Sequence, residues 1–299
     1  MTRVFGVLCV RDAADVVGAV LRNTLALGVE RVIVLDNGST DGTTQVLERL
    51  ARRHPIDWSP YSGPFVQAQI ISDLVAGAVA AGADWVLPVD ADEFWWCERG
   101  LLNVLDQTDA GALYCPFVQF VQRWDVEHGT PRGLLTMTRR AAERPPDDDP
   151  PAVVARGDAS VVEIRQPRKV IVRAGPGVGV GVGAHDAVNA PGPLAPADDI
   201  VVLHAPLRAR ATLTARTVRP MRADHTEVAA DELTAWHAKR WRRLAAEGPD
   251  ALDAEWRANA YGPNGTLLVG GREHATIEDH RLAEAAAPWV GRRWGRRRA

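Results

Sequence analysis

The chain has 299 residues, of which 46% are hydrophobic and 24% are charged, and its formal net charge at pH 7 is −3. These values indicate a globular protein, and they argue against a disordered chain and a strongly basic nucleic-acid-binding protein. No stretch approaches the ~20 apolar residues of a membrane-spanning helix. Cys9, Cys97 and Cys115 form no CxxC motif, so reduced thiols in a cytoplasmic protein are expected.

The first third of the chain alternates apolar strands with helical patterns. The expected strands span 4–10, 31–35 and 85–89, and the expected helices follow Asp15, follow Asp41 and span 66–81. Alternating strands and helices predict a mostly parallel sheet with right-handed crossovers and helices on its faces. The predicted fold class is therefore α/β, with a Rossmann-like nucleotide-binding layer over at least residues 1–95.

The segment Asp90-Ala91-Asp92-Glu93-Phe94 directly follows the third expected strand. Open α/β sheets bind ligands at the carboxyl ends of their strands, where these two carboxylates stand. Mg²⁺ and Mn²⁺ bound by one or two carboxylates commonly complete their shells with water and nucleotide phosphates. The motif therefore suggests a metal–diphosphate site, although an Asp-rich strand end is also typical of an ordinary turn or helix cap.

Four motifs give the chain a resemblance to glycosyltransferase family 2, which has the GT-A fold. They are Val10-Arg11-Asp12 followed by Asp15, the segment 34–43, the segment 84–87 and the segment 90–94. The resemblance is strong over residues 4–95 and patchy to about residue 220, and it is closest to the branch with an Asp-x-Asp-Glu-Phe motif. One departure is Asp12-Ala13, where the family usually has Asn-Glu, so a carboxylate is missing at position 13.

The resemblance implies an inverting glycosyltransferase that uses Mn²⁺ or Mg²⁺ and a UDP-, GDP- or dTDP-sugar donor. Asp92 would coordinate the metal, Asp90 would contact the metal shell or the ribose, and Glu93 would orient them. Asp36 would face the nucleoside, although its position also suits a turn cap. Two basic side chains, Arg11 and Lys169, complete the donor-binding residues. Lys169 or its neighbour Arg168 would stabilise the departing diphosphate together with the metal.

The metal-binding histidine and the catalytic base are less constrained by the sequence. In related GT-A enzymes a histidine late in the domain binds the metal, and His185 is ranked slightly ahead of His204. A carboxylate would take the proton of the acceptor hydroxyl, and Glu163 and Asp186 are the first candidates. Asp158 is a further candidate, and Asp125 is a more distant one.

Aromatic residues and loops are expected on the acceptor side. At most one of Trp95 and Trp96 is expected to face an acceptor, because neighbours on a strand point to opposite faces. Residues 145–151, Pro-Pro-Asp-Asp-Asp-Pro-Pro, are predicted to form a solvated loop without regular structure. The glycine-rich segment 175–186 lacks a following helix, so a flap over the donor is expected rather than a dinucleotide-binding loop.

Two regions are predicted: a GT-A domain over 1–220 and a helical C-terminal extension with a basic tail over 221–299. The basic residues of this extension suggest peripheral contact with the inner face of a membrane, or a solvated helix face. Two alternatives to the transferase remain, a nucleotidyltransferase on a similar sheet and a degenerate protein that binds nucleotide or carbohydrate without catalysis. The acceptor and the sugar are not determined by the sequence.

Overall fold

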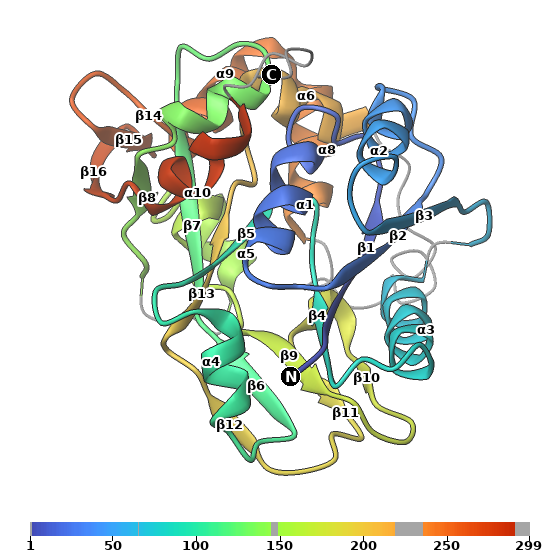
Figure 1. Ribbon diagram of the computed structural model, residues 1–299. Coiled ribbons are helices and arrows are strands. Elements are labelled where there is room, and N and C mark those ends of the chain that lie inside the picture. Colours follow the sequence, from blue (N-terminus) through green and yellow to red (C-terminus); the bar gives the residue numbers. More distant parts are fainter. Residues whose placement is uncertain (1, 65, 145–148, 219–235, 291–299) are drawn as a thin grey trace.

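The computed structural model describes residues 2–64, 66–144, 149–218 and 236–290. Its first sheet has seven strands in the order β12-β6-β9-β4-β1-β2-β3 (Figure 1). In chain order these strands are β1 (Val4–Val10), β2 (Arg31–Asp36), β3 (Ile56–Pro60), β4 (Trp85–Pro88), β6 (Ala112–Cys115), β9 (Lys169–Arg173) and β12 (Leu194–Pro196). Only β9 runs antiparallel to its two neighbours, β4 and β6. The predicted α/β class with a mostly parallel sheet flanked by helices is confirmed.

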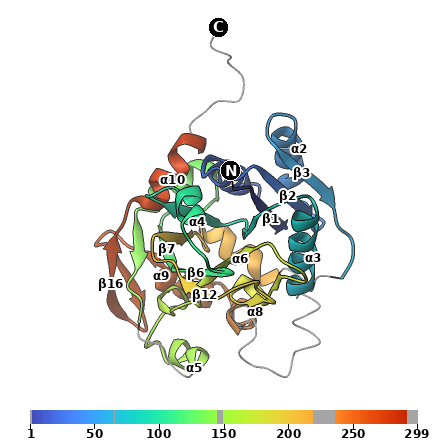
Figure 2. The same ribbon diagram turned by 60° about the horizontal axis from the view of Figure 1, so that its bottom comes forward.

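Helices cover both faces of this sheet, as the apolar strands require. The helices of the N-terminal part are α1 (Val17–Ala26), α2 (Thr43–Ala51), α3 (Gln67–Ala80) and α4 (Leu101–Asp106). On one face, α3 packs Ile71 and Val75 against Phe5 and Val7 of β1. On the other face, α1, α2 and α4 belong to a second and larger apolar cluster. Both views of the ribbon place α3 beside β1 and away from α4 (Figure 2).

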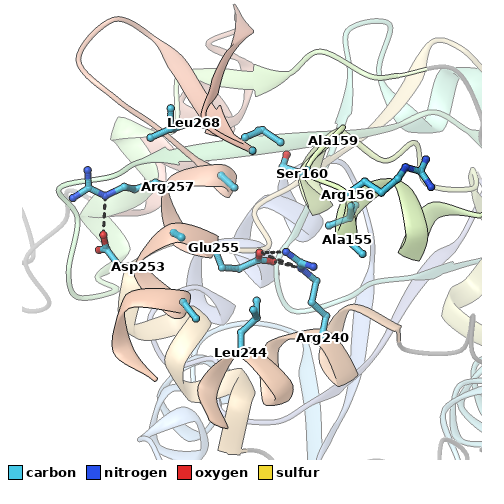
Figure 3. A pocket seen from close by; sticks show the side chains of 18 of the residues that line it. Ala155, Arg156, Ala159, Ser160, Arg240, Leu244, Asp253, Glu255, Arg257 and Leu268 are labelled. Atoms are coloured by element: carbon cyan, nitrogen blue, oxygen red, sulfur yellow. Dashed lines mark hydrogen bonds and ion pairs between the residues drawn. The ribbon is translucent and has the colours of Figure 1, made fainter. Parts of the chain in front are cut away.

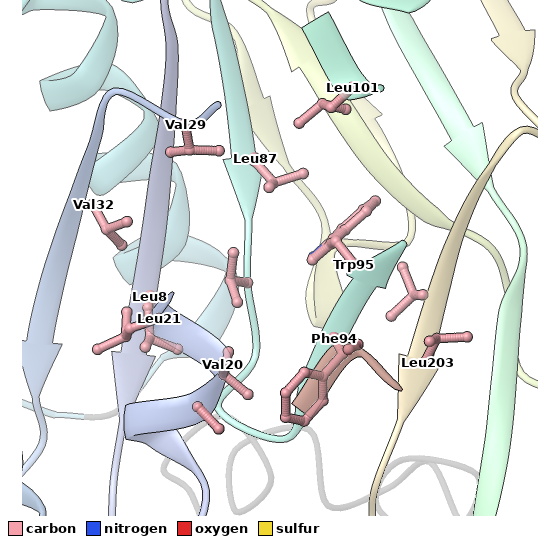
Figure 4. Packing of buried hydrophobic residues seen from close by; sticks show 14 of the residues in the cluster. Leu8, Val20, Leu21, Val29, Val32, Leu87, Phe94, Trp95, Leu101 and Leu203 are labelled. Atoms are coloured by element: carbon pink, nitrogen blue, oxygen red, sulfur yellow. The ribbon is translucent and has the colours of Figure 1, made fainter. Parts of the chain in front are cut away.

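A second sheet lies against the larger cluster. Its strands are β5 (Glu93–Cys97), β7 (Phe117–Arg123), β8 (Arg139–Ala141), β13 (Ile200–His204), β15 (Thr266–Val269) and β16 (Arg272–Glu278), with β14 (Ala260–Tyr261) paired to β7. Buried side chains of β5 and β13, including Phe94, Trp95 and Leu203, belong to one cluster with Leu8 and Leu87 of the first sheet (Figure 4). Burying an aromatic side chain of this size contributes on the order of 2–3 kcal/mol, so this shared core holds the two sheets together.

The C-terminal region contains strands as well as the predicted helices. Its helices are α6 (Arg210–Val218), α8 (Trp236–Glu247), α9 (Pro249–Asn259) and α10 (Arg281–Val290). The β15–β16 hairpin joins the second sheet through β8, and α10 packs on α1. The described residues beyond 220 therefore pack against the N-terminal part of the chain. The basic tail Arg292–Arg298 lies outside the described residues, and no helix within the described ranges could cross a bilayer.

Residues 149–155 correct one prediction. A solvated loop was expected over 145–151, and residues 145–148 lie outside the described part, but Pro150–Ala155 form helix α5. Asp149 caps this helix by accepting a hydrogen bond from the Ala152 N–H at 3.0 Å. Proline is compatible with the first turn of a helix, where its missing N–H would have no intrahelical partner. The two prolines therefore begin a helix here instead of preventing one.

The glycine-rich segment 175–186 forms a short hairpin beside α3. Its strands β10 (Gly179–Val180) and β11 (Ala187–Val188) are antiparallel, with a single 3₁₀ turn, η3 (Val182–Ala184), between them. The Ser72 hydroxyl of α3 donates to the Val180 carbonyl and accepts from the Val180 N–H, both at 3.1 Å. Gly183 has a φ of +67°, which glycine adopts without steric cost. Movement of this segment over a donor stays a prediction.

Candidate active site

The Asp90–Glu93 segment forms the turn from β4 of the first sheet to β5 of the second. Parallel pairing of β4 with β1 brings the carboxyl ends of both strands to the same edge. The Val89 N–H donates to the Val7 carbonyl at 2.9 Å, which extends the ladder to the residue before Asp90. Asp90 and Asp92 therefore stand where an open α/β sheet binds its ligands, as the sequence predicts.

Lys169 joins two carboxylates at this edge. Its Nζ lies 2.7 Å from Asp90 Oδ2 and 2.7 Å from Glu93 Oε1, and its side chain is only 4% exposed. Burial acts against the ammonium charge, but the two carboxylates raise the pKa of Lys169 above its ordinary value. Burial raises the pKa of Glu93 well above its ordinary value, and Lys169 opposes this rise. The sequence-predicted residues Asp90, Glu93 and Lys169 thus form one contact group.

Asp92 forms a second group with three basic side chains. Arg216 Nη2 of α6 lies 2.9 Å from Asp92 Oδ2, and Arg208 Nη1 lies 3.6 Å from the same oxygen. His204 Nε2 lies 3.6 Å from Asp92 Oδ1. Burial acts against ionisation of Asp92, but His204, Arg216 and Arg208 hold its pKa below the ordinary range.

Strand register explains why His204 reaches Asp92. β13 pairs with β5 so that His204 is opposite Glu93, and it pairs with β7 so that His204 is opposite Gln119. The His204 Nδ1–H donates to Gln119 Oε1 at 2.7 Å, which fixes the ring with its Nε2 toward Asp92. A histidine oriented through its other ring nitrogen is typical of metal-binding histidines.

Arg208 also connects Asp92 to the loop after β1. Its guanidinium forms a bidentate ion pair with Asp15, with Nε–Oδ2 at 2.7 Å and Nη2–Oδ1 at 2.9 Å. Ala13, where the family usually has a glutamate, is buried, and its N–H donates to Thr43 Oγ1 at 2.8 Å. The sequence placed Asp15 in a family motif and in front of a helix without giving it a role, and in the structure it supplies the carboxylate that this loop directs to the site.

His185 and Asp186 lie on the Asp90 side of the site. The His185 Nδ1–H donates to the Arg168 carbonyl at 3.1 Å. Burial lowers the pKa of His185 and Lys169 lowers it further, while the carboxylates of Asp90 and Asp186 act in the opposite direction. The structure therefore brings His185 near Asp90, and it brings the rival His204 next to Asp92, the residue predicted to bind the metal.

Asp36 and Arg11 lie in the turn network beside this edge. Asp36 is buried; its Oδ1 accepts from the Ser39 N–H at 3.0 Å, and its Oδ2 accepts from the Thr44 hydroxyl at 2.5 Å. These are the contacts of a turn cap, the alternative that the sequence left open. Arg11 is half-exposed, with its Nε 3.7 Å from Asp12 Oδ2. A nucleoside contact of Asp36 and a donor contact of Arg11 stay predictions.

Glu163 is a buried residue whose carboxylate is bonded to its neighbours in the fold. It ends the 3₁₀ helix η2 (Val161–Glu163), its side chain is 3% exposed, and it accepts from the Ser160 N–H at 2.8 Å and from His274 Nδ1 at 2.9 Å. Arg144 Nε lies 3.8 Å away. None of these partners contacts Asp90 or Asp92 in the described part of the chain, so the structure does not bring Glu163 to the site.

The two tryptophans after the motif have different exposures. Trp95 is 1% exposed and belongs to the core between the sheets, whereas Trp96 is partly exposed at its edge. An acceptor contact of Trp96 stays a prediction. Sequence reasoning missed Gln119, Arg208 and Arg216, and the only sequence signal was that Arg208 follows His204 closely.

The described residues contain no ready-made cluster of three or more His, Cys, Asp or Glu side chains for a metal ion. At the candidate active site, Asp92 Oδ1 and His204 Nε2 lie 3.6 Å apart. A divalent ion at this pair would take most of its ligands from donor phosphates and water, which is common for Mg²⁺ and related ions.

A comparison with known families identifies the first half of the chain. The family model described as glycosyl transferase family 2 matches residues 7–150. This match covers the motifs that predict a resemblance to the family. The predicted family and activity class are confirmed. The matched segment contains Asp15, Asp36, Asp90 and Asp92. The basic residues that contact Asp90 and Asp92 from β9, β13 and α6, namely Lys169, His204 and Arg216, lie beyond it.

Comparisons of the chain with curated proteins and with solved structures find only distant likeness. No curated protein matches the chain. TarS 1-349 of S. aureus is 14% identical, with 75% of this chain and 68% of that chain covered and a TM-score of 0.40. Its complex with UDP-GlcNAc gives the same identity and coverage, with a TM-score of 0.38. Glucosyl-3-phosphoglycerate synthase from Mycobacterium tuberculosis, in complex with Mn²⁺, UDP and phosphoglyceric acid, is 18% identical, with 39% and 43% covered and a TM-score of 0.29.

Proposed function

We propose that this protein transfers a sugar from a nucleotide-diphosphate donor to an acceptor hydroxyl, with a divalent cation at Asp92. The observation that carries the proposal is the convergence of Asp90 and Asp92 with Lys169, Arg208 and Arg216 at the carboxyl edge of a family 2 sheet. Ligands of open α/β sheets bind at this edge, and basic groups beside carboxylates suit a diphosphate bound through a cation.

The charges of the site support use of a cation. Four carboxylates, counting Asp15 and Glu93, meet the three basic side chains, so the group has no surplus positive charge. A diphosphate adds further negative charge. A divalent ion bound by Asp92 would offset that charge and stabilise the departing diphosphate.

The donor atoms fit Mn²⁺ or Mg²⁺. Asp92 Oδ1 offers a hard oxygen, and His204 Nε2, oriented by Gln119, offers an imidazole nitrogen at 3.6 Å from it. An imidazole ligand favours Mn²⁺ over Mg²⁺. We therefore prefer His204 to His185 as the histidine that would hold the ion, with Asp90 contacting water of the ion's shell or the donor ribose.

The basic residues would act on the donor. Arg216 approaches Asp92 from α6, and its guanidinium has the planar donors that bind phosphate oxygens in pairs. When donor binds, Arg216 would exchange the Asp92 carboxylate for a phosphate oxygen. Lys169 would remain between Asp90 and Glu93 and keep both carboxylates in place.

An inverting reaction needs a base for the acceptor hydroxyl. Asp186 is exposed and lies close enough to His185 for its charge to affect that group, which supports it as the candidate. Glu163 is not supported, because its carboxylate is buried and already bonded to Ser160 and His274. The accepted proton would move to Asp186 as the acceptor oxygen attacks the anomeric carbon and the diphosphate leaves.

Two experiments separate this proposal from its alternatives. Calorimetry should detect binding of one of UDP-, GDP- or dTDP-glucose only with Mn²⁺ or Mg²⁺, and slow hydrolysis of that donor should accompany it. Asp92→Asn should abolish both, while Asp199→Asn, which changes an exposed carboxylate paired with Arg99, should leave both unchanged. A folded protein that binds none of the donors would overturn the proposal. Metal-dependent binding without turnover in any acceptor screen would favour the degenerate binder, and pyrophosphate release from a nucleoside triphosphate would favour the nucleotidyltransferase.

A further inference from the structure

A pocket of about 620 Å³ lies among α5, α8, α9 and β15 (Figure 3). Its volume is in the range of sites for small molecules, about 300–1,000 Å³. None of the residues that contact Asp90 or Asp92 lines it. The pocket is therefore a feature separate from the candidate active site.

The lining is aliphatic and electrically balanced. The apolar wall consists of small and branched residues: Val154, Ala155, Ala159, Leu244, Ala251, Ala254, Ala258, Leu268 and Val269. Among the residues that the structure describes, no aromatic side chain lines the pocket. Each of its three arginines has a carboxylate partner. Arg240 pairs with Glu255 and Arg257 pairs with Asp253 (Figure 3), and Arg156 pairs with Asp158 outside the lining. The lining also contains Asp250, so its three arginines and its three carboxylates, Asp250, Asp253 and Glu255, carry no net formal charge.

One polar side chain in the wall has no partner. Ser160 is 1% exposed, and its hydroxyl makes no hydrogen bond in the described structure. A buried hydroxyl without a partner costs on the order of 1–3 kcal/mol. A ligand in the pocket with a hydroxyl or carbonyl group would supply the missing partner.

The surrounding frame is held in place by its own bonds. Glu255 accepts from Arg240 Nη2 at 2.8 Å and from Trp241 Nε1 at 2.9 Å. Asn259 accepts from the Val162 N–H at 3.1 Å, which ties α9 to the segment that carries Ser160. A pocket framed in this way needs little rearrangement to bind, and preorganisation favours affinity.

We propose that this pocket is a second ligand site, for an uncharged molecule with an aliphatic body and one hydroxyl or carbonyl group. The aliphatic wall contacts the body, and Ser160 bonds the polar group. The absence of aromatic surfaces from the lining argues against a flat ring system, and the internal ion pairs argue against a charged ligand. Binding here does not depend on the proposed transferase activity.

Hexan-1-ol, hexanoate and hexylammonium test the proposal, because they share a chain and differ in charge. Titration of the full chain, followed by amide NMR shifts, should give saturable binding of hexan-1-ol, with affinity at least tenfold higher than for either ion. The shifts should include residues of α9 and β15. Equal binding of the ions, or no saturable shift in the pocket, would overturn the proposal.

Variants localise the binding. Ala254→Trp fills the pocket from an exposed position of α9, and hexan-1-ol binding should be lost. Ala246→Trp adds the same side chain at an exposed position of α8 outside the lining, and binding should persist. Ser160→Ala should weaken hexan-1-ol about three- to tenfold, the value of one neutral hydrogen bond. Undiminished binding to Ala254→Trp would contradict the assignment.

Discussion

Asp15 and Arg208 form a bidentate ion pair across 193 positions of the chain. The pair joins the loop after β1 to the residues after β13, and Arg208 extends from it to Asp92. Burial acts against the charge of Arg208, whose side chain is 8% exposed, but Asp15 and Asp92 raise its pKa above the ordinary value. The charge of Arg208 is thus maintained by these two carboxylates, and the pair links the first sheet to the Asp92 group.

Asp15→Asn is expected to lower the free energy of unfolding by about 2–4 kcal/mol, because removing one member of a buried pair leaves the other poorly compensated. Arg208 keeps its bond to the Ala205 carbonyl and its contact with Asp92, which limits the loss. Urea unfolding of Asp15→Asn and of the native protein measures this change in the free energy of unfolding. The matched control is Asp199→Asn in the exposed pair with Arg99, where no resolvable change is expected. Equal effects of the two substitutions would contradict the structural role of Asp15.

Lys169 and Glu93 should be energetically coupled. Lys169→Met leaves two carboxylates without their shared cation, so it should destabilise the fold by about 3–5 kcal/mol. Glu93→Gln removes the charge of the more deeply buried carboxylate. The double variant should be about 1–3 kcal/mol more stable than the sum of the two single effects predicts. A double-mutant cycle in urea measures this coupling. Strict additivity would show that the Lys169–Glu93 contact has no energetic weight.

Three strands of the first sheet, β1, β2 and β4, could be predicted because their signals are local. The apolar run 4–10 coincides with β1, and the helical spacing over 66–81 coincides with α3 to within one residue at each end. The Asp90–Asp92 motif lies at the strand end where it was expected. Strand character and helical periodicity depend on neighbouring residues, which a sequence displays directly.

The partners of Asp92 could not be predicted, because they depend on register and on long-range packing. His185 and His204 are similar candidates in the sequence, and only the pairing of β13 with β5 brings His204 opposite Glu93 and next to Asp92. Arg216 reaches Asp92 from a helix 124 positions away. Glu163 resembles a catalytic base in the sequence, but burial and the bond to His274 give it a structural environment.

Asp92 should contribute a pH-dependent part of the stability. Burial opposes its ionisation, yet His204, Arg216 and Arg208 hold its pKa below the ordinary value of about 3.8. A carboxylate with a lowered pKa in the fold contributes its stability above the unfolded pKa and loses it as pH falls through the folded pKa. Asp92→Asn should therefore be less stable than the native protein at pH 7, and the difference should shrink below about pH 4.

Thermal unfolding of both proteins between pH 7 and pH 2 measures this difference. Asp57→Asn is the control, because Asp57 is paired with Arg31 at an exposed position of β3 and should give no such trend. A stability difference for Asp92→Asn that is constant over this range would show that the three basic side chains do not lower the pKa of Asp92.

Gly111 and Gly77 offer a matched test of the packing at the edge of the first sheet. A Cβ at Gly111 would lie 2.3 Å from the Gly192 backbone nitrogen, where β6 meets the chain leading into β12, and backbone atoms cannot yield as a flexible side chain can. Gly111→Ala should therefore destabilise the fold by about 1–3 kcal/mol. Gly77 lies on the exposed side of α3 with open space around it, so Gly77→Ala should stabilise by about 0.5–1 kcal/mol through helix propensity. Urea unfolding of both variants distinguishes the two effects, and a neutral Gly111→Ala would mean that β12 is not held against β6 in solution.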